Sequence, residues 1–294
     1  MKTSLDCIPC FTRQALDSAR RVTDDARVHE EVMRRVLELA SRLDLRQPPP
    51  VTGQEIHRIL RKVTGNPDPY KEVKEQFNRF ALNLFPALKK QVKHSADRFQ
   101  TAVRLAIAGN VIDFGVRSTV SEQDVYDAIE EVLRAKIDRA ALEALREKAT
   151  AARDILDVAD NAGEIVFDRL LIEELLPAKV TLVVKARPVL NDATRDDAQT
   201  AGLMDLVELL DTGSDAPATI LSEAPEELRR RFREADLILS KGQGNYESLN
   251  EIEEEVFFLL KAKCPVIAED IGCKVGSVVV TRKAPAGIVR SAPK

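Results

Sequence analysis

The sequence lacks both an excess of positive charge and long apolar runs. Its 294 residues include 44 lysines and arginines against 48 aspartates and glutamates, with a formal net charge of −4. This mildly acidic balance argues against nucleic-acid binding, which usually needs a basic face. No apolar run approaches the roughly 20 residues that span a bilayer. The N-terminal residues, MKTSLDCIPCFTRQ, lack the apolar segment of a signal peptide. We therefore expect a cytoplasmic protein with no membrane or nucleic-acid partner.

Cysteine is scarce as well. Four cysteines in a chain of this length are too few for a disulfide scaffold. Cys7 and Cys10 have the spacing of half a zinc site, and Cys264 and Cys273 would complete it only if the fold brought them near. A disulfide, a redox pair or two buried structural thiols are the alternatives for the CxxC pair.

Histidine is rare and confined to one part of the chain. His29, His57 and His94 all lie in the first hundred residues. No histidine therefore stands near the polar loops that follow the expected strands. This placement counts against a zinc hydrolase and against a Ser-His-Asp mechanism.

The first half of the chain reads almost wholly as helix. Apolar residues recur there at three- and four-residue spacing, and Asp68-Pro69 is typical of a helix start. The segment AVRLAIAG, 102–109, is apolar on nearly every side, which predicts a buried helix. RQPPP at 46–50 predicts a break or linker. The helices are expected at 11–23, 29–43, from 69 toward 93, within 96–115, from about 121 to 137 and from 139 to about 152.

From Ile155 onward, short β-rich runs alternate with amphipathic helices. Such alternation predicts a largely parallel sheet covered on both faces. We expect an α/β protein with a helical subdomain at 1–152 and an α/β domain at 153–294. The strands are expected at 155–159, 179–186, 206–211, 235–242 and 265–270, with a last edge strand at 276–282. The helices between them are expected at 164–176, 195–203, 225–234 and 247–261.

Polar residues follow successive strands of the predicted sheet. In an open parallel sheet, ligands bind beyond the carboxyl ends of the strands, so these residues should meet at one edge. Asp160 and Asn161 follow the first strand and Asp192 follows the second. Carboxylate and amide oxygens are the ligands that Mg²⁺ or Mn²⁺ prefers. These three residues are our candidate metal ligands.

The same loops contain groups that suit a phosphate. Lys241 could hold a phosphoryl oxygen as a point charge, and the glycine-rich loop after it leads to Asn245. The helix that starts near Gly163 would direct backbone N–H groups and the positive end of its dipole toward the same anion. We expect Gly163, Lys241 and Asn245 to contact substrate. Phosphoryl transfer needs mostly positioning and charge neutralisation, which this set could supply.

Each of these signals has a plainer explanation when taken alone. An Asp-Asn or Asn-Asp pair after a strand is more often a turn or a helix cap than a ligand, and SKGQGN could be a flexible loop. Their shared position after successive strands is what favours a metal-phosphate site.

Four motifs in series resemble one family, the damage-control phosphatases, once a family of unknown function. They are GNVIDFG at 109–115, DNAGE at 160–164, NDATRDDA at 191–198 and SKGQGNYE at 240–247. The N-terminal CIPC and the DPYKE of 68–72 look like the stand-alone archaeal and bacterial branch. The resemblance covers nearly the whole chain in the right order.

The resemblance implies a three-layer α/β/α domain, with the site between it and the helical subdomain. It carries the metal ligands onto Asp160, Asn161 and Asp192, and the phosphate-binding lysine onto Lys241. It further implies that Asn110 and Asp113 belong to the pocket. The catalytic residues would be Asp160, Asp192 and Lys241.

The implied activity is a metal-dependent phosphatase acting on small phosphate esters, such as sugar phosphates or phosphopantetheine and its damaged forms. Mg²⁺, Mn²⁺, Co²⁺ or Ni²⁺ would be the cofactor, and the attacking group a metal-activated water or the carboxylate of Asp160 or Asp192. One alternative is an S-adenosylmethionine-dependent carboxyl methyltransferase, but DNAGE stands where its glycine-rich loop is expected. Another is a non-catalytic phosphometabolite-binding protein. The oligomeric state stays open.

Overall fold

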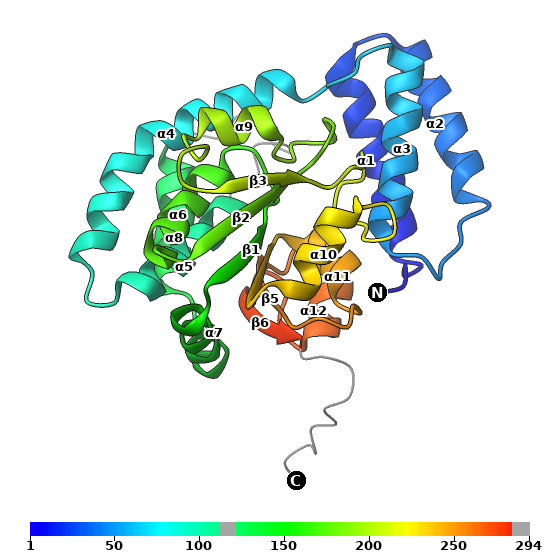
Figure 1. Cartoon of the computed structure of the whole chain (residues 1–294). Coiled ribbons are helices and arrows are strands. Elements are labelled where there is room, and N and C mark those ends of the chain that lie inside the picture. The colour runs from blue at the N-terminus through cyan, green and yellow to red at the C-terminus, as the bar shows by residue number, and fades with distance from the viewer. Residues whose placement is uncertain (112–121, 284–294) are drawn as a thin grey trace.

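A computed structural model describes residues 1–111 and 122–283 of the chain. The predicted pocket residue Asp113 lies outside these ranges. The first half is helical, as predicted (Figure 1). Its helices are α1 (Cys7–Val22), α2 (Ala26–Ala40), α3 (Pro49–Thr64), α4 (Lys71–His94), α5 (Arg98–Val111), α6 (Glu122–Arg134) and α7 (Arg139–Ala151).

The second half alternates strands with helices around one six-stranded sheet. Its strands are β1 (Asp154–Val158), β2 (Lys179–Val184), β3 (Glu208–Asp211), β4 (Leu237–Lys241), β5 (Val256–Lys261) and β6 (Val278–Lys283). The spatial order is β3-β2-β1-β4-β5-β6; β6 is antiparallel to β5, and the other neighbouring pairs of described strands are parallel. The predicted parallel sheet and its last edge strand are thus confirmed. The strand order reverses between β1 and β4, which is where α/β sheets bind ligands.

Helices cover both faces of this sheet (Figure 1). The helix α8 (Glu164–Leu175) and the helices α4–α7 pack on one face of the sheet, and together with that face they form a single hydrophobic core. The opposite face is covered by α10 (Glu226–Glu234), α11 (Gln243–Leu249) and α12 (Pro265–Ile271). The short α9 (Arg195–Thr200) lies against α4. The helices α1–α3 pack around a separate core that contains Phe11, Val32 and Ile56.

The predicted buried helix is confirmed in α5. Apolar side chains from Ala102 to Ala108 are 0% exposed, and α5 packs directly on α8. An apolar stretch without a polar face requires neighbours all round, which α4, α6, α8 and the sheet provide. This central position brings the C-terminal end of α5 to the carboxyl edge of β1.

The predicted helix at 247–261 and the predicted strand at 265–270 are wrong. Helix α11 ends at Leu249, and VFFLLK forms the buried strand β5, because a continuous run of aromatic and aliphatic residues suits a parallel strand covered on both faces. Pro265 occupies the first turn of α12, where its missing N–H costs nothing. The residues that follow the fifth strand are therefore Ala262 to Cys264.

The predicted break at 46–50 also hides a helix that the pattern did not reveal. Pro48 is the N-cap of α3, and Pro49 and Pro50 form its first turn. A fixed proline φ is compatible with this position, so a run of prolines can start a helix as well as separate two.

Candidate active site

The loop after β1 and the loop after β2 pair with each other at the carboxyl edge of the sheet. Asn161 and Asp192 form an isolated antiparallel bridge. On either side of it, Ala193 N–H donates to the carbonyl of Asp160 and Ala162 N–H donates to the carbonyl of Asn191, both at 2.8 Å. These backbone bonds bring the three candidate metal ligands, Asp160, Asn161 and Asp192, side by side.

Two side-chain amides hold the carboxylates of this site. The Nδ2 groups of Asn110 and Asn161 each donate to Asp160 Oδ2 at 2.7 Å. The same two Nδ2 groups donate to Glu164 Oε2 at 2.9 Å. Asn110 comes from the end of α5, so the helical half contributes a side chain to the site.

The loop after β4 lies directly against Asp160. Gly242 has a φ of +81° and a ψ of +163°, a conformation that essentially only glycine adopts. A Cβ added to Gly242 would lie 1.9 Å from Asp160 Oδ2. The sequence needs glycine here both for the backbone and for the space that the carboxylate fills.

The N–H of Gly163 does not face an open anion site in this structure. It donates to Asn78 Oδ1 of α4 at 2.6 Å. Gly163 has a φ of +74°, and an added Cβ would lie 2.3 Å from the ring of Phe77. The residue thus fixes the start of α8 against α4.

Asn245 joins three backbone segments at the same edge. Its Nδ2 donates to the carbonyl of Ala159 at 3.1 Å and to that of Lys241 at 2.8 Å. Its Oδ1 accepts from Thr219 N–H at 2.9 Å. These bonds tie the ends of β1 and β4 to the loop that follows β3, which supports the walls of the site.

Lys241 is buried beneath the ligand set, with a side chain 1% exposed. Its Nζ donates to the Ala106 carbonyl at 2.9 Å, to Glu164 Oε1 at 2.8 Å and to Asp168 Oδ1. Burial lowers the pKa of Lys241, but the carboxylates of Asp168 and Glu164 outweigh it, and the pKa is raised. Burial also raises the pKa of Asp168 well above its usual value, although Lys241 opposes this shift.

Lys185, which sequence reasoning missed, is a second buried lysine at this edge. It follows β2, is 2% exposed, and its Nζ donates to the Ala159 carbonyl at 3.3 Å. The same Nζ forms an ion pair with Asp192 Oδ2 at 3.5 Å. A lysine at the end of an otherwise apolar strand, KVTLVVK, was the signal that could have revealed it, since lysine is rarely buried without a partner.

The two candidate carboxylates are strongly affected by burial. Burial raises the pKa of Asp160 to about 6, the charge of Glu164 adds to the shift, and Lys185 opposes it. Burial likewise raises the pKa of Asp192 to about 7, with Lys185 opposing and Asp160 adding. A bound cation would favour the ionised form of both groups.

The donor set fits a hard divalent cation in its chemistry. All three predicted ligands offer oxygen, and among the described residues Asp192 Oδ2 is buried without a hydrogen-bond donor. Residues 1–111 and 122–283 contain no group of three or more His, Cys, Asp and Glu side chains that could hold a metal ion. The predicted set has only two such side chains, and its third member is an amide.

The CxxC pair is affected by a third thiol. Burial is the main cause that raises the pKa of Cys7 and of Cys10, and the charges of Cys264 and Glu247 raise both further. Gln243 Nε2 donates to Cys264 Sγ at 3.6 Å and to Glu247 Oε1 at 3.0 Å. All three cysteines are free thiols.

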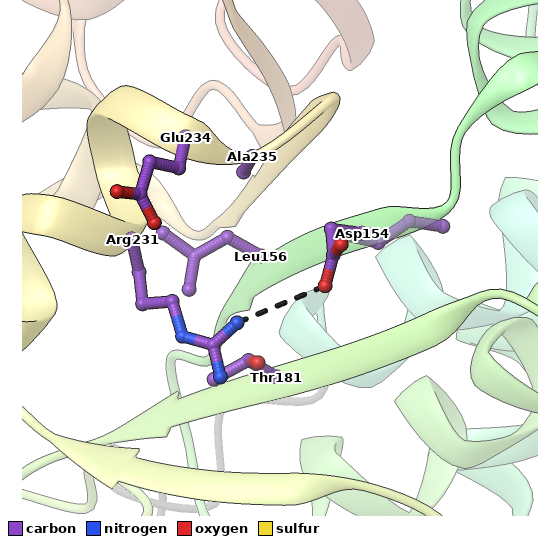
Figure 2. A pocket seen from close by; sticks show the side chains of 7 residues that line it. Asp154, Leu156, Thr181, Arg231, Glu234 and Ala235 are labelled. Carbon is purple, nitrogen blue, oxygen red and sulfur yellow. Dashed lines mark ion pairs between the residues drawn. The ribbon is translucent and has the colours of Figure 1, made fainter.

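A small pocket lies at the opposite edge of the sheet. It encloses about 60 Å³ and is lined by the start of β1 and by α10, and Figure 2 shows Arg231 paired with Asp154 across it. Arg231 also pairs with Glu208, so its charge is balanced. Ligand pockets usually enclose about 300 Å³ or more, so we do not assign this hollow to a substrate.

Comparison with known proteins identifies the family of the chain. Residues 3–279 match the model of the damage-control phosphatase ARMT1-like domain. The chain is 35% identical to damage-control phosphatase PH1575 of Pyrococcus horikoshii, over 96% of this chain and 98% of that protein. It is 37% identical to a damage-control phosphatase of Archaeoglobus fulgidus, over 95% and 98%.

Two further comparisons concern structure and substrate. The crystal structure of the DUF89 family protein from Pyrococcus horikoshii superposes with a TM-score of 0.87 at 34% identity, covering 96% of this chain and 99% of that one. A mouse protein named 4'-phosphopantetheine phosphatase is 30% identical over 53% of this chain and 22% of its own length.

In the described part of this chain, no helix is both long and apolar enough to cross a membrane.

Proposed function

Because the chain belongs to the family of damage-control phosphatase ARMT1-like domains, we propose that it is a metal-dependent phosphatase that hydrolyses small phosphate esters. Sugar phosphates, phosphopantetheine and damaged phosphometabolites are the substrate classes. The name of the mouse relative supports phosphopantetheine as one of them. The cofactor is a divalent cation, with Mg²⁺, Mn²⁺, Co²⁺ and Ni²⁺ as the candidates.

One observation carries this proposal. The bridge between Asn161 and Asp192 joins the loops that follow β1 and β2, and the loop after β4 lies against Asp160 beside it. A turn or a helix cap would not need two carboxylates and an amide from separate loops at one point. Buried carboxylates are costly unless they are paired or bind a cation, so this grouping supports a cation site.

The roles of the chain's own residues follow from their contacts. Asp160, Asn161 and Asp192 would hold the cation, which when bound neutralises phosphoryl oxygens and activates water. Asn110 orients Asp160 and Glu164 from the helical side. Lys241 lies beneath the site, where its ammonium holds the carboxylates of Glu164 and Asp168. Most of these side chains are buried, and their removal from bulk water strengthens each electrostatic interaction among them.

Two routes of attack fit these residues, and one variant separates them. Either a water molecule or the carboxylate of Asp160 or Asp192 attacks phosphorus. Asp160→Asn keeps an oxygen donor but removes the nucleophilic carboxylate. If this variant binds the cation and retains full turnover, Asp160 is not the nucleophile. If it binds the cation and forms no product, the carboxylate of Asp160 is required.

The test of the proposed function is phosphate release by metal-stripped protein. The substrates are sugar phosphates, nucleotides and phosphopantetheine, each with Mg²⁺, Mn²⁺, Co²⁺ or Ni²⁺ added separately. Asp192→Ala is the test variant, and Asp196→Ala is the matched control, an exposed aspartate four residues further along the chain. We expect turnover that requires metal, is lost in Asp192→Ala and persists in Asp196→Ala.

Other outcomes would point to the alternative functions. Phosphate esters that bind without any turnover would support the non-catalytic binding protein. Methyl transfer from S-adenosylmethionine to a carboxylate, with no phosphate release, would support the methyltransferase. Turnover that is equal with and without added metal would refute the role assigned to the cation.

A further inference from the structure

Two buried lysines lie at the carboxyl edge of the sheet, Lys241 at the end of β4 and Lys185 just beyond β2. We propose that Lys185 supplies the ammonium group that contacts the phosphate of the substrate, and that Lys241 is a positioning residue that holds Glu164. This proposal rests on the proposed function, since it assumes that a phosphate ester enters the site. It reassigns the role that the family resemblance gives to Lys241.

The ammonium group of Lys241 has no donor to spare. A lysine ammonium has three N–H donors, and Lys241 Nζ has three acceptors, namely the Ala106 carbonyl, Glu164 Oε1 and Asp168 Oδ1. A bond to phosphate would require that one of these be broken. A buried acceptor would then be left without its donor, which is unfavourable.

The ammonium group of Lys185 is less fully engaged. Its Nζ donates at 3.3 Å to the Ala159 carbonyl, while Asp192 Oδ2 lies 3.5 Å away as an ion pair without a hydrogen bond. At least one of its three donors can therefore serve an anion, at no cost to a buried contact. Removal from bulk water makes that contact stronger than it would be at the surface.

Lys185 is also in the right place for this contact. It lies between the carboxylate of Asp192 and the backbone carbonyl that precedes Asp160, so it is adjacent to two of the proposed metal ligands. A phosphate that meets a cation held by those ligands has to come close to this ammonium group.

Two other lysines act on these carboxylates and are weaker candidates. Lys74 of α4 is buried too, but its ammonium is held by Asp68 Oδ2 at 2.9 Å, a closer ion pair than the 3.5 Å between Lys185 and Asp192. Lys263, which follows β5, is exposed, and its charge opposes the rise in the pKa of Asp160. An exposed ammonium contributes less to anion binding because water screens it.

The experiment compares binding of a metal ion and of inorganic phosphate by calorimetry. Mg²⁺ is titrated into metal-stripped protein, and inorganic phosphate is then titrated into the same protein, both without metal and with saturating Mg²⁺. The variants are Lys185→Met and Lys185→Arg. Lys179→Met is the matched control, because Lys179 lies at the other end of β2, half exposed and paired with Glu208.

We expect Lys185→Met to weaken phosphate binding by about tenfold or more, as for loss of a charged hydrogen bond. Its Mg²⁺ affinity should be equal or higher, because a positive charge beside Asp192 has been removed. Lys185→Arg should recover part of the phosphate affinity, and Lys179→Met should change neither. If Lys185→Met does not fold, Lys185→Gln replaces it, since glutamine keeps a donor for the Ala159 carbonyl.

Several results would overturn the proposal. They are phosphate binding by Lys185→Met within twofold of the wild type, a loss of phosphate affinity in Lys263→Met instead, or no phosphate binding by the wild-type protein with or without metal. Failure of the proposed function looks different. Phosphate binding that depends on Lys185, in a protein that hydrolyses no ester with any metal, would support the role of Lys185 and refute the phosphatase.

Discussion

Replacement of Lys241 by methionine should destabilise the fold, because this lysine holds a buried cluster of acidic groups together. Methionine matches the length of lysine but removes the three donors to Ala106, Glu164 and Asp168. Asp157, whose pKa is raised to about 6 chiefly by burial, would also lose the nearby positive charge. The variant therefore leaves several buried acidic groups without a cation.

The size of the effect follows from the burial of the ion pairs. Side chains of Lys241, Glu164 and Asp168 are 1% exposed or less, so no allowance for solvent screening is needed. Removing one partner of a buried pair costs about 3–5 kcal/mol, which for a chain of this length corresponds to a fall in Tm of roughly 5–10 °C. The free energy of unfolding of such a protein is about 5–15 kcal/mol, so the loss is a large fraction of it.

The loss should depend on pH in a defined direction. The pKa of Asp168 is already raised, and without Lys241 it rises further in the folded state only. When the folded state raises the pKa of a carboxyl group, the free energy of unfolding falls as pH rises toward that pKa. The difference in this free energy between variant and wild type should therefore shrink on acidification. Lys241→Met/Asp168→Leu should recover part of the stability at pH 8, since a well-packed apolar pair can replace a buried ion pair.

Urea unfolding at pH 8 and pH 5, followed by circular dichroism, measures these quantities for wild type, both single variants and the double variant. The four proteins form a double-mutant cycle, which isolates the interaction between Lys241 and Asp168. A loss below about 1 kcal/mol for Lys241→Met at pH 8, the range of exposed pairs, would refute the view that Lys241 is a positioning residue inside a buried cluster.

Three further predictions concern other parts of the chain. Burial, together with the charge of Arg61, lowers the pKa of His57 from 6.5 to about 4, so the unfolded chain takes up a proton at His57 more readily than the folded one. The free energy of unfolding therefore falls as pH falls from 7 toward 4. His57→Leu should remove about 2 kcal/mol of this loss between pH 7 and pH 4.5, as measured by urea unfolding. Gly242→Ala should lower Mg²⁺ affinity about tenfold or more in calorimetry, because its Cβ would displace a ligand carboxylate, whereas Gly65→Ala, with φ +69° and nothing within 4 Å, should not; equal affinities would contradict this. Raised pKa values predict that Cys7 and Cys10 react with a disulfide reagent at pH 7.5 more slowly than free cysteine, because less thiolate is present, and equal rates would contradict the raised pKa values.

Much of the site's position could be predicted from the sequence, because strand ends carry their own signals. Apolar runs that stop at Asp160 and before Asp192 locate the carboxyl ends of two strands. The parallel-sheet rule then places both residues at one edge, as the structure has them. The contribution of Asn110 could not be predicted from spacing, because nothing in a helical sequence tells which strand its end will meet.

The helix predicted at 247–261 and the strand predicted at 265–270 were wrong because β5 and α12 are both short and rich in apolar residues. A glutamate-rich stretch before β5 reads as the continuation of a helix, whereas the apolar VFFLLK after it is buried between α5 and α11. PVIAED has β-branched residues but begins with a proline that starts α12. Only the packing of neighbouring elements separates these alternatives, since a short apolar run suits both a strand and a buried helix.

The different roles of the two lysines depend on strand register, which no single strand specifies. In the register of β1 and β4, Asp157 pairs with Leu239 and Val158 pairs with Ser240. Because side chains alternate between the two faces, Lys241 lies on the same face as Leu239 and Asp157, which α5 and α8 cover. Val183 of β2 pairs with Val158, on the other face of the sheet. Lys185 lies two residues beyond Val183 and therefore on that same face. One lysine is therefore enclosed by acidic groups from α8, while the other remains beside the metal-ligand loops. From composition alone, Lys241, directly before the glycine-rich loop, is the natural candidate for phosphate. Once the register is known, the alternation of side chains favours Lys185, just beyond β2.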